Sequence, residues 1–113
     1  MNEFKEIMES LKTFRNDRDW KQFHNPKDLA TAISIEASEL QELFLWKKNE
    51  ELDEVDEQKI RDELADIFSF SFLILDHYGF DLNEIISDKI KKNAKKYPIS
   101  KSKGTSTKYD ELK

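Results

Sequence analysis

The sequence predicts an all-α protein, a bundle of four main helices followed by a flexible C-terminal tail. Only two glycines and two prolines occur in 113 residues, and apolar residues recur at helical spacing over long segments. No alternating apolar run bounded by turn residues indicates a strand. We therefore expect one helical domain over residues 1–98 and a basic tail over residues 99–113.

The first two helices are expected over about residues 2–16 and 26–48. In the first, four apolar side chains recur every three or four residues: Phe4, Ile7, Leu11 and Phe14. The second begins at a helix-start signal, with Asn25 as the N-cap and Pro26 in the first helical position. Its inward stripe combines apolar residues with one acid: Leu29, Ala32, Ile33, Glu36, Leu40 and Leu43.

The third and fourth helices are expected over about residues 57–78 and 82–97. One stripe of the third again contains an acid: Ile60, Glu63, Ile67, Phe70 and Ile74. Its opposite side is also apolar, so we expect a central helix that is buried on both sides. Gly79 is expected to cap this helix, Asp81 to begin the next, and Pro98 to end it.

Two pairs of acids, each pair three residues apart, are the main candidates for chemistry. Glu36 and Glu39 form one pair, and Glu63 and Asp66 form the other. Residues at this spacing share a helix face, so antiparallel packing of the two helices would bring the four side chains together. Such a group must be protonated, reach water or hold cations. Oxygen ligands without histidine or cysteine favour Mg²⁺, with Mn²⁺ as a possible substitute.

Two other interpretations of these acids need to be weighed. In a chain with 38% charged residues, E-x-x-E and E-x-x-D also arise by chance as solvated salt-bridge formers. A di-iron site needs Glu-x-x-His pairs, and neither His24 nor His77 lies three residues after a glutamate. The joint occurrence of the pairs on two inward stripes favours a metal site over the first interpretation, and the histidine positions argue against the second.

Several segments of the chain resemble a known family. EASE at 36–39 and ELAD at 63–66, separated by 23 residues, resemble the E-x-x-E…E-x-x-D signature of the MazG-like all-α nucleotide pyrophosphohydrolases. Further likeness to the dCTP pyrophosphatase-like branch is carried by RDWKQFHNPKDLA, ELQELFLWK, KIKKNAKKYP and SKGTSTKYDEL. The ordered set covers most of the chain.

The resemblance implies an Mg²⁺-dependent enzyme that converts a nucleoside triphosphate and water into a monophosphate and diphosphate. It implies that the metal ligands, which are also the catalytic residues, are Glu36, Glu39, Glu63 and Asp66. One of these carboxylates is a candidate to accept the proton of the attacking water. The physiological role implied is housecleaning of dCTP-like or modified deoxynucleotides. A diphosphatase for dUTP or for many nucleotides, and a non-catalytic helical nucleotide-binding protein, are the alternatives.

The resemblance also implies a set of substrate-binding residues. A base pocket, which could be completed across subunits, would be lined by Trp20, His24 and Trp46. Phe70, a further substrate residue, stands where some relatives carry a tyrosine. Without the family, ordinary packing would be the preferred interpretation of Trp20. Phosphate contacts would come from the last predicted helix and the tail, through Lys89, Lys92, Asn93, Lys96 and Lys103.

Charge and composition bear on partners and location. Residues 1–88 carry ten basic and 22 acidic side chains, whereas residues 89–113 carry nine lysines and two acids. The acidic body argues against nucleic-acid binding. No apolar run approaches the ~20 residues that cross a bilayer, and the chain has no cysteine, so we expect a cytoplasmic protein without a membrane partner. The family resemblance implies a homo-oligomer, with a tetramer favoured and a dimer second.

Overall fold

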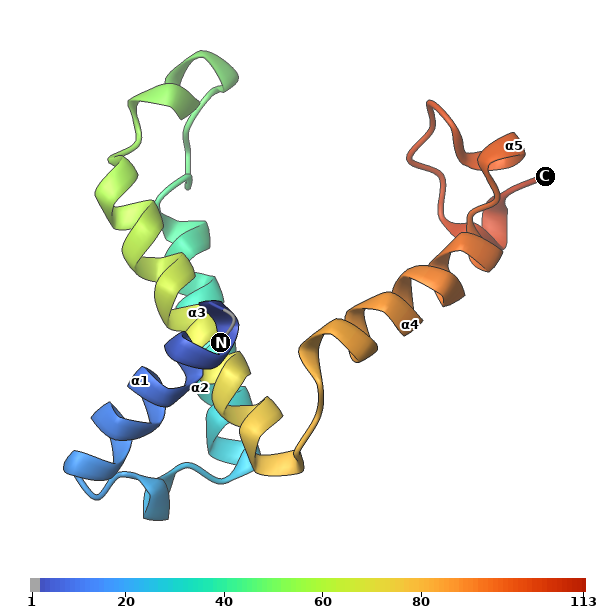
Figure 1. The fold of residues 1–113 in the computed structure, drawn as a ribbon. Coiled ribbons are helices and arrows are strands. Elements are labelled where there is room, and N and C mark those ends of the chain that lie inside the picture. The colour runs from blue at the N-terminus through green and yellow to red at the C-terminus, as the bar shows by residue number, and fades with distance from the viewer. Residues whose placement is uncertain (1–2) are drawn as a thin grey trace. The chain divides into compact units, whose positions relative to one another are not determined.

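The computed structural model describes residues 3–113 and contains four long helices (Figure 1). These are α1 (Glu3–Asp17), α2 (Pro26–Glu42), α3 (Glu57–Tyr78) and α4 (Leu82–Lys96). Shorter helical segments are η1 (Lys21–Phe23), η2 (Asn49–Glu54), α5 (Ile99–Ser102) and η3 (Tyr109–Glu111). No strand occurs within residues 3–113, which confirms the all-α prediction. In the same range, no helix has both the length and the apolar character that a membrane span requires.

The chain divides into two compact units. The first ends at Gly79 and holds α1, α2 and α3, and the second begins at Phe80 and holds α4, α5 and η3. The predicted boundary between residues 98 and 99 lies inside the second unit. The two acidic pairs therefore belong to one unit, and the predicted phosphate-binding lysines belong to the other.

The helix ends follow the capping residues that the sequence indicates. The Asn25 side chain accepts a hydrogen bond from the backbone N–H of Asp28 at 2.8 Å, and Asp81 accepts one from Glu84 at 2.8 Å. Both bonds satisfy N–H groups that the first helical turn leaves free. Gly79 ends α3 with φ of 67°, a left-handed conformation that glycine adopts without a steric cost. These predicted caps are confirmed.

The prediction that the second helix reaches residue 48 is wrong, because α2 ends at Glu42. From Leu43 to Leu45 the backbone N–H groups bond to carbonyls three residues earlier, which tightens the chain into turns. Trp46 then adopts φ of 65°, a left-handed backbone conformation that does not continue the helix. A bulky side chain rarely takes this conformation, so the composition of the segment gives no warning of the stop.

In the first unit, α2 and α3 lie side by side and run antiparallel (Figure 1). The apolar residues with the least exposure are Leu29 on α2 and Leu73 and Leu75 on α3. Helix α1 packs against α3, where the rings of Phe4 and Phe72 meet edge to face at 5.0 Å. This packing places the acidic pairs of α2 and α3 next to each other.

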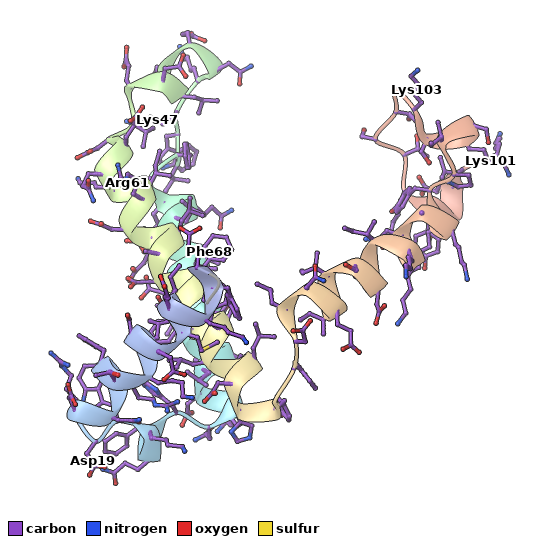
Figure 2. The ribbon with its side chains drawn as sticks, viewed as in Figure 1. Asp19, Lys47, Arg61, Phe68, Lys101 and Lys103 are labelled. Carbon is purple, nitrogen blue, oxygen red and sulfur yellow. The ribbon has the colours of Figure 1, made fainter. Side chains whose placement is uncertain are left out.

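The second side of α3 is not covered by the described residues of the first unit. Phe68, labelled in Figure 2, is 54% exposed, and Leu64 one turn earlier is also exposed. An apolar groove of about 390 Å³ lies between α1 and α3 at Ile7, Ala65 and Phe72. The expectation of burial on both sides of this helix is therefore not met by the chain's own first unit.

In the second unit, the residues after Pro98 are not simply extended. Helix α5 follows directly, and η3 brings Tyr109 to the end of α4, where its ring meets that of Tyr97 at 6.1 Å. The Lys96 ammonium lies 4.8 Å from the centre of the Tyr109 ring, a cation–π contact. The tail thus has local structure of its own, and its flexibility stays a prediction.

Candidate metal centre and adjoining pocket

The packing of α2 against α3 gathers three carboxylates into one group. Glu36 and Glu39 come from α2 and Glu63 comes from α3, and one oxygen of each lies within 4.8 Å of the others. Asp66, one turn after Glu63, is outside this group of three. Its charge nevertheless acts on both Glu36 and Glu63, so it lies at the edge of the same negative cluster.

Crowding changes the acidity of two of these side chains. The pKa of Glu36 is raised to about 8, first by its side-chain hydrogen bond with Glu63, then by burial, and then by Glu39 and the charge of Asp66. For Glu63 the bond with Glu36 lowers the pKa, but burial and the other two acids outweigh it and the pKa is raised. Without a cation, Glu36 therefore keeps a proton near neutral pH, and its hydrogen bond shares that proton with Glu63.

The group has the properties that a hard divalent cation requires. Within residues 3–113, Oε2 of Glu36 and Oε2 of Glu63 are buried and have no hydrogen-bond partner. The ion pairs in this part of the chain lie elsewhere, around Asp76. A cation would replace the shared proton and occupy the unsatisfied oxygens. All the available ligand atoms are carboxylate oxygens, which fits Mg²⁺ or Mn²⁺.

A cavity of about 430 Å³ adjoins the acidic cluster. Asp66 lines it on the side of the cluster, and its walls include Phe14, Trp20, His24 and Phe70. The Trp20 ring meets the Phe14 ring at 5.7 Å and the His24 ring at 6.4 Å, both in edge-on geometry. Two of the predicted base-pocket residues, Trp20 and His24, are thus brought together with Phe70, another predicted substrate residue, beside a predicted metal ligand.

His24 is an unsatisfied polar group in this cavity. Its Nδ1 is buried and has no hydrogen-bond partner in residues 3–113. Burial, and to a smaller extent the charge of Arg15, lower the pKa of His24 below its ordinary value of 6.5. The imidazole is therefore neutral at physiological pH.

Within the first unit, the structure does not bring Trp46 to this cavity. Trp46 is 90% exposed and lies beyond the far end of α2, whose 17 residues span about 25 Å from the end near His24. The remaining predicted residues lie in the second unit and are exposed, with Lys103 in the loop after α5 (Figure 2): Lys89, Lys92, Asn93, Lys96 and Lys103. Their contacts with phosphates stay predictions.

Sequence reasoning missed Arg15, which lines the same cavity. It is a charged residue that is only 5% exposed, and it lies four residues after Leu11 on the side of α1 that faces α3. That spacing could have placed Arg15 on the inward face of the helix. The sequence analysis instead assigned Phe14 to the apolar stripe, and Phe14 is exposed.

Comparison with known proteins agrees with this architecture. A profile of the MazG-like family matches residues 31–112. The chain is 34% identical over 104 residues to dCTP pyrophosphatase 1 of Bos taurus, covering 88% of this chain and 62% of that protein. Against dCTP pyrophosphatase 1 of Homo sapiens the identity is 32%, covering 88% and 61%. The chain thus spans less than two thirds of the length of these relatives.

A solved structure shares this fold over nearly the whole length of the solved chain. The crystal structure of a pyrophosphatase from Archaeoglobus fulgidus matches with a TM-score of 0.82 and 33% identity, covering 87% of this chain and 94% of that one. The chain therefore belongs to the MazG-like family.

Proposed function

We propose that the protein is a metal-dependent nucleotide pyrophosphohydrolase, which converts a nucleoside triphosphate and water into a monophosphate and diphosphate. The observation that supports this most is the group of Glu36, Glu39 and Glu63. Within residues 3–113, no basic side chain forms an ion pair with these three acids. The aromatic cavity beside it has room for a nucleobase. Relatives named as pyrophosphatases point to the same reaction.

In this proposal, the acids of the cluster bind the cation and take part in the reaction, and the aromatic cavity binds the base. Glu36, Glu39 and Glu63 would hold the divalent cation, and Asp66 would complete the ligand set from the edge nearest the cavity. A bound Mg²⁺ supplies charge neutralisation of the phosphates and lowers the pKa of a water molecule. One of the carboxylates accepts the proton of the attacking water. The base stacks on Trp20 in the cavity, which directs the phosphates toward the acids.

The substrate we propose is dCTP or a modified deoxynucleotide of similar shape, removed as housecleaning in the cytoplasm. The names of the two mammalian relatives support this choice. A panel of natural and modified deoxynucleoside triphosphates, assayed with Mg²⁺ for monophosphate and diphosphate, tests it. Preference for dUTP, or equal rates across the panel, would replace this substrate with the broader alternatives. Absence of any product would contradict the enzymatic proposal.

The second unit would supply the phosphate contacts. Its predicted phosphate-binding residues are exposed and available to a ligand: Lys89, Lys92, Asn93, Lys96 and Lys103. Protease digestion with and without a slowly hydrolysed nucleotide and Mg²⁺ tests this role. Protection of the segment around Lys103 is expected, and an unchanged digestion pattern would remove the tail from the site.

We propose a homo-oligomer, with a tetramer favoured. The support is the exposed apolar surface of α3, where Leu64 and Phe68 lie beside the groove toward α1. Surfaces of this kind are typically covered by another chain. An exposed Trp46 agrees with a base pocket completed by a second subunit. Sedimentation of a monomer at micromolar concentration would contradict both the tetramer and the dimer.

A further inference from the structure

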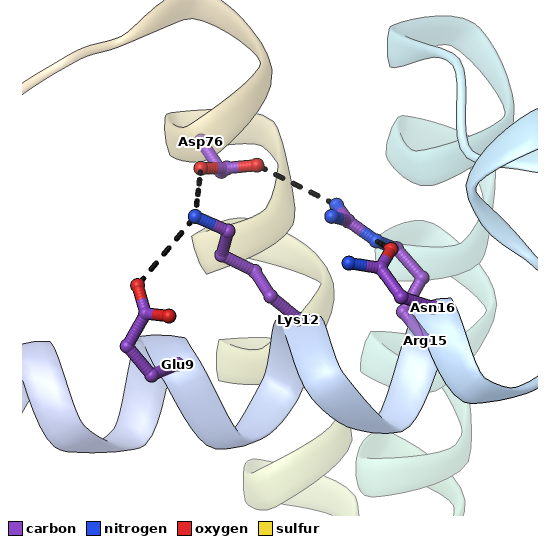
Figure 3. Close-up of polar contacts among 5 residues, drawn as sticks. All are labelled: Glu9, Lys12, Arg15, Asn16 and Asp76. Carbon is purple, nitrogen blue, oxygen red and sulfur yellow. Dashed lines mark hydrogen bonds and ion pairs between the residues drawn. The ribbon is translucent and has the colours of Figure 1, made fainter.

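Arg15 is a buried cation with more hydrogen-bond donors than the side chains around it accept from. It lies near the end of α1, and its residue is 5% exposed. Its Nε donates to Oδ1 of Asn16 at 3.0 Å, and its Nη1 lies 3.5 Å from Oδ2 of Asp76 (Figure 3). These contacts account for two of the five N–H donors of a guanidinium.

Asp76 is also shared between two cations. Lys12 Nζ lies 3.6 Å from Oδ1 of Asp76, on the other oxygen from the one that faces Arg15 (Figure 3). Both distances are long for charge-assisted hydrogen bonds, which are typically about 2.7–2.9 Å. One carboxylate therefore neutralises the two cations only in part, and Arg15 retains both positive charge and donors for another acceptor.

That acceptor would come from the cavity, because Arg15 lines it. The walls beside Arg15 are aromatic, at Phe14, Trp20 and Phe70, which suits a planar group. Buried Nδ1 of His24 is a second polar atom without a partner. The acid at the cavity edge, Asp66, repels an anionic group, so a neutral ring with a polar edge fits better than a phosphate.

We propose that Arg15 is a specificity-determining residue, which donates a hydrogen bond to the C2 carbonyl oxygen of a pyrimidine base in this cavity. The site would then favour cytosine and uracil, which both carry this carbonyl beside the glycosidic nitrogen, over adenine, which has no carbonyl. A buried donor whose acceptor is missing or displaced loses its hydrogen bond, so adenine binds less tightly. This inference rests on the proposed function, in which the cavity holds a nucleobase.

The test compares Arg15→Met with Lys12→Met by calorimetric titration. The ligands are the α,β-imido analogues of dCTP, dUTP and dATP with Mg²⁺, which resist hydrolysis at the relevant bond. Lys12 is the matched control, because it shares Asp76 but does not line the cavity. Circular dichroism at the titration temperature shows whether each variant is folded.

For Arg15→Met, we expect the affinity for the dCTP and dUTP analogues to fall about tenfold, the loss of one charge-assisted hydrogen bond. The affinity for the dATP analogue should change less than about threefold. Lys12→Met should leave the relative affinities for all three unchanged. The two pyrimidines share the C2 carbonyl and differ at N3 and C4, so equal losses for them place the contact at the shared carbonyl.

Arg15→Lys carries the same test if the methionine variant does not fold, because it keeps the charge and loses the planar fork. Its preference for the dCTP analogue over the dATP analogue should fall. Equal losses for the three analogues, or none, would overturn the role of Arg15 while leaving the proposed function standing. If the wild-type protein binds none of the analogues, the proposed function falls as well.

Discussion

Helix α3 carries acids in two contrasting settings. Near its C-terminal end, Asp76 lies between Lys12 and Arg15 of α1, with both cations within 3.6 Å (Figure 3). Closer to its start, Glu63 faces Glu36 and Glu39 of α2, and these acids meet other acids. Helix α3 thus presents to α1 a carboxylate that is paired with cations, and to α2 a carboxylate that is not.

This difference distinguishes a carboxylate that stabilises the fold from carboxylates that are candidates for binding and chemistry. The contacts of Asp76 join α1 to α3, so its charge is used within the fold. At Glu63 the fold gains nothing from the charges, because like carboxylates repel and burial disfavours the ionised form. Acids that the fold leaves uncompensated are the ones expected to meet a cation from outside.

The largest effect is expected from Glu63→Gln. The amide keeps the shape of the side chain but removes a ligand charge, so pyrophosphate release should fall by more than about a hundredfold. The melting temperature without metal should not fall, because a repulsion is relieved. Asp62→Asn, at an exposed neighbouring position, is the control and should retain activity. Full activity in Glu63→Gln would remove the cluster from the mechanism.

Asp76→Asn should have the next largest effect, on stability. It leaves the buried Arg15 without its counter-charge, and we expect a loss of about 2 kcal/mol in the free energy of unfolding. Urea denaturation followed by circular dichroism measures it. Magnesium affinity should be unchanged if the two charged sites are independent. A stability equal to that of the wild type would mean that the tether between α1 and α3 is weak.

The cluster should also make metal-free stability depend on pH. Glu36 keeps its proton up to about pH 8 in the folded protein, whereas its ordinary pKa is 4.5. Between these values folding takes up a proton, so stability falls as pH rises and levels off above the folded pKa. Melting temperatures measured in a chelator across this range should show that slope. It should flatten in Glu36→Gln, and an unchanged slope would place the titration elsewhere.

The smallest effect is expected from Lys12→Met. Lys12 lies 3.5 Å from Glu9 and 3.6 Å from Asp76, but it is partly exposed, and such pairs contribute little in water. The change in the free energy of unfolding should be below about 0.5 kcal/mol. A loss as large as that of Asp76→Asn would show that Lys12, rather than Arg15, holds the junction.

The sequence predicted those features that local rules control. The third helix lies where it was expected, between an acidic start and the left-handed Gly79. The convergence of Glu36, Glu39 and Glu63 followed from helical spacing and antiparallel packing. Periodicity and capping fix these features within a few residues of the chain, so one sequence is enough to find them.

Features that depend on distant contacts were missed. The end of α2 at Glu42 requires Trp46 in a conformation that its residue type disfavours. The burial of Arg15 depends on Asp76, 61 residues later on another helix. Nothing in the local pattern marks the end of α2. The spacing of Arg15 from Leu11 does indicate an inward position, but a charged residue at such a position is usually assigned to the surface.

Trp46 has a practical consequence. Its indole stands almost wholly in water in the single chain, while Trp20 is the other tryptophan of the protein. Fluorescence from an indole shifts to shorter wavelength when water is excluded from it. Docking of another molecule over Trp46 would therefore shift the emission spectrum without any attached label. Replacing Trp20 by phenylalanine would leave Trp46 as the single source of that signal.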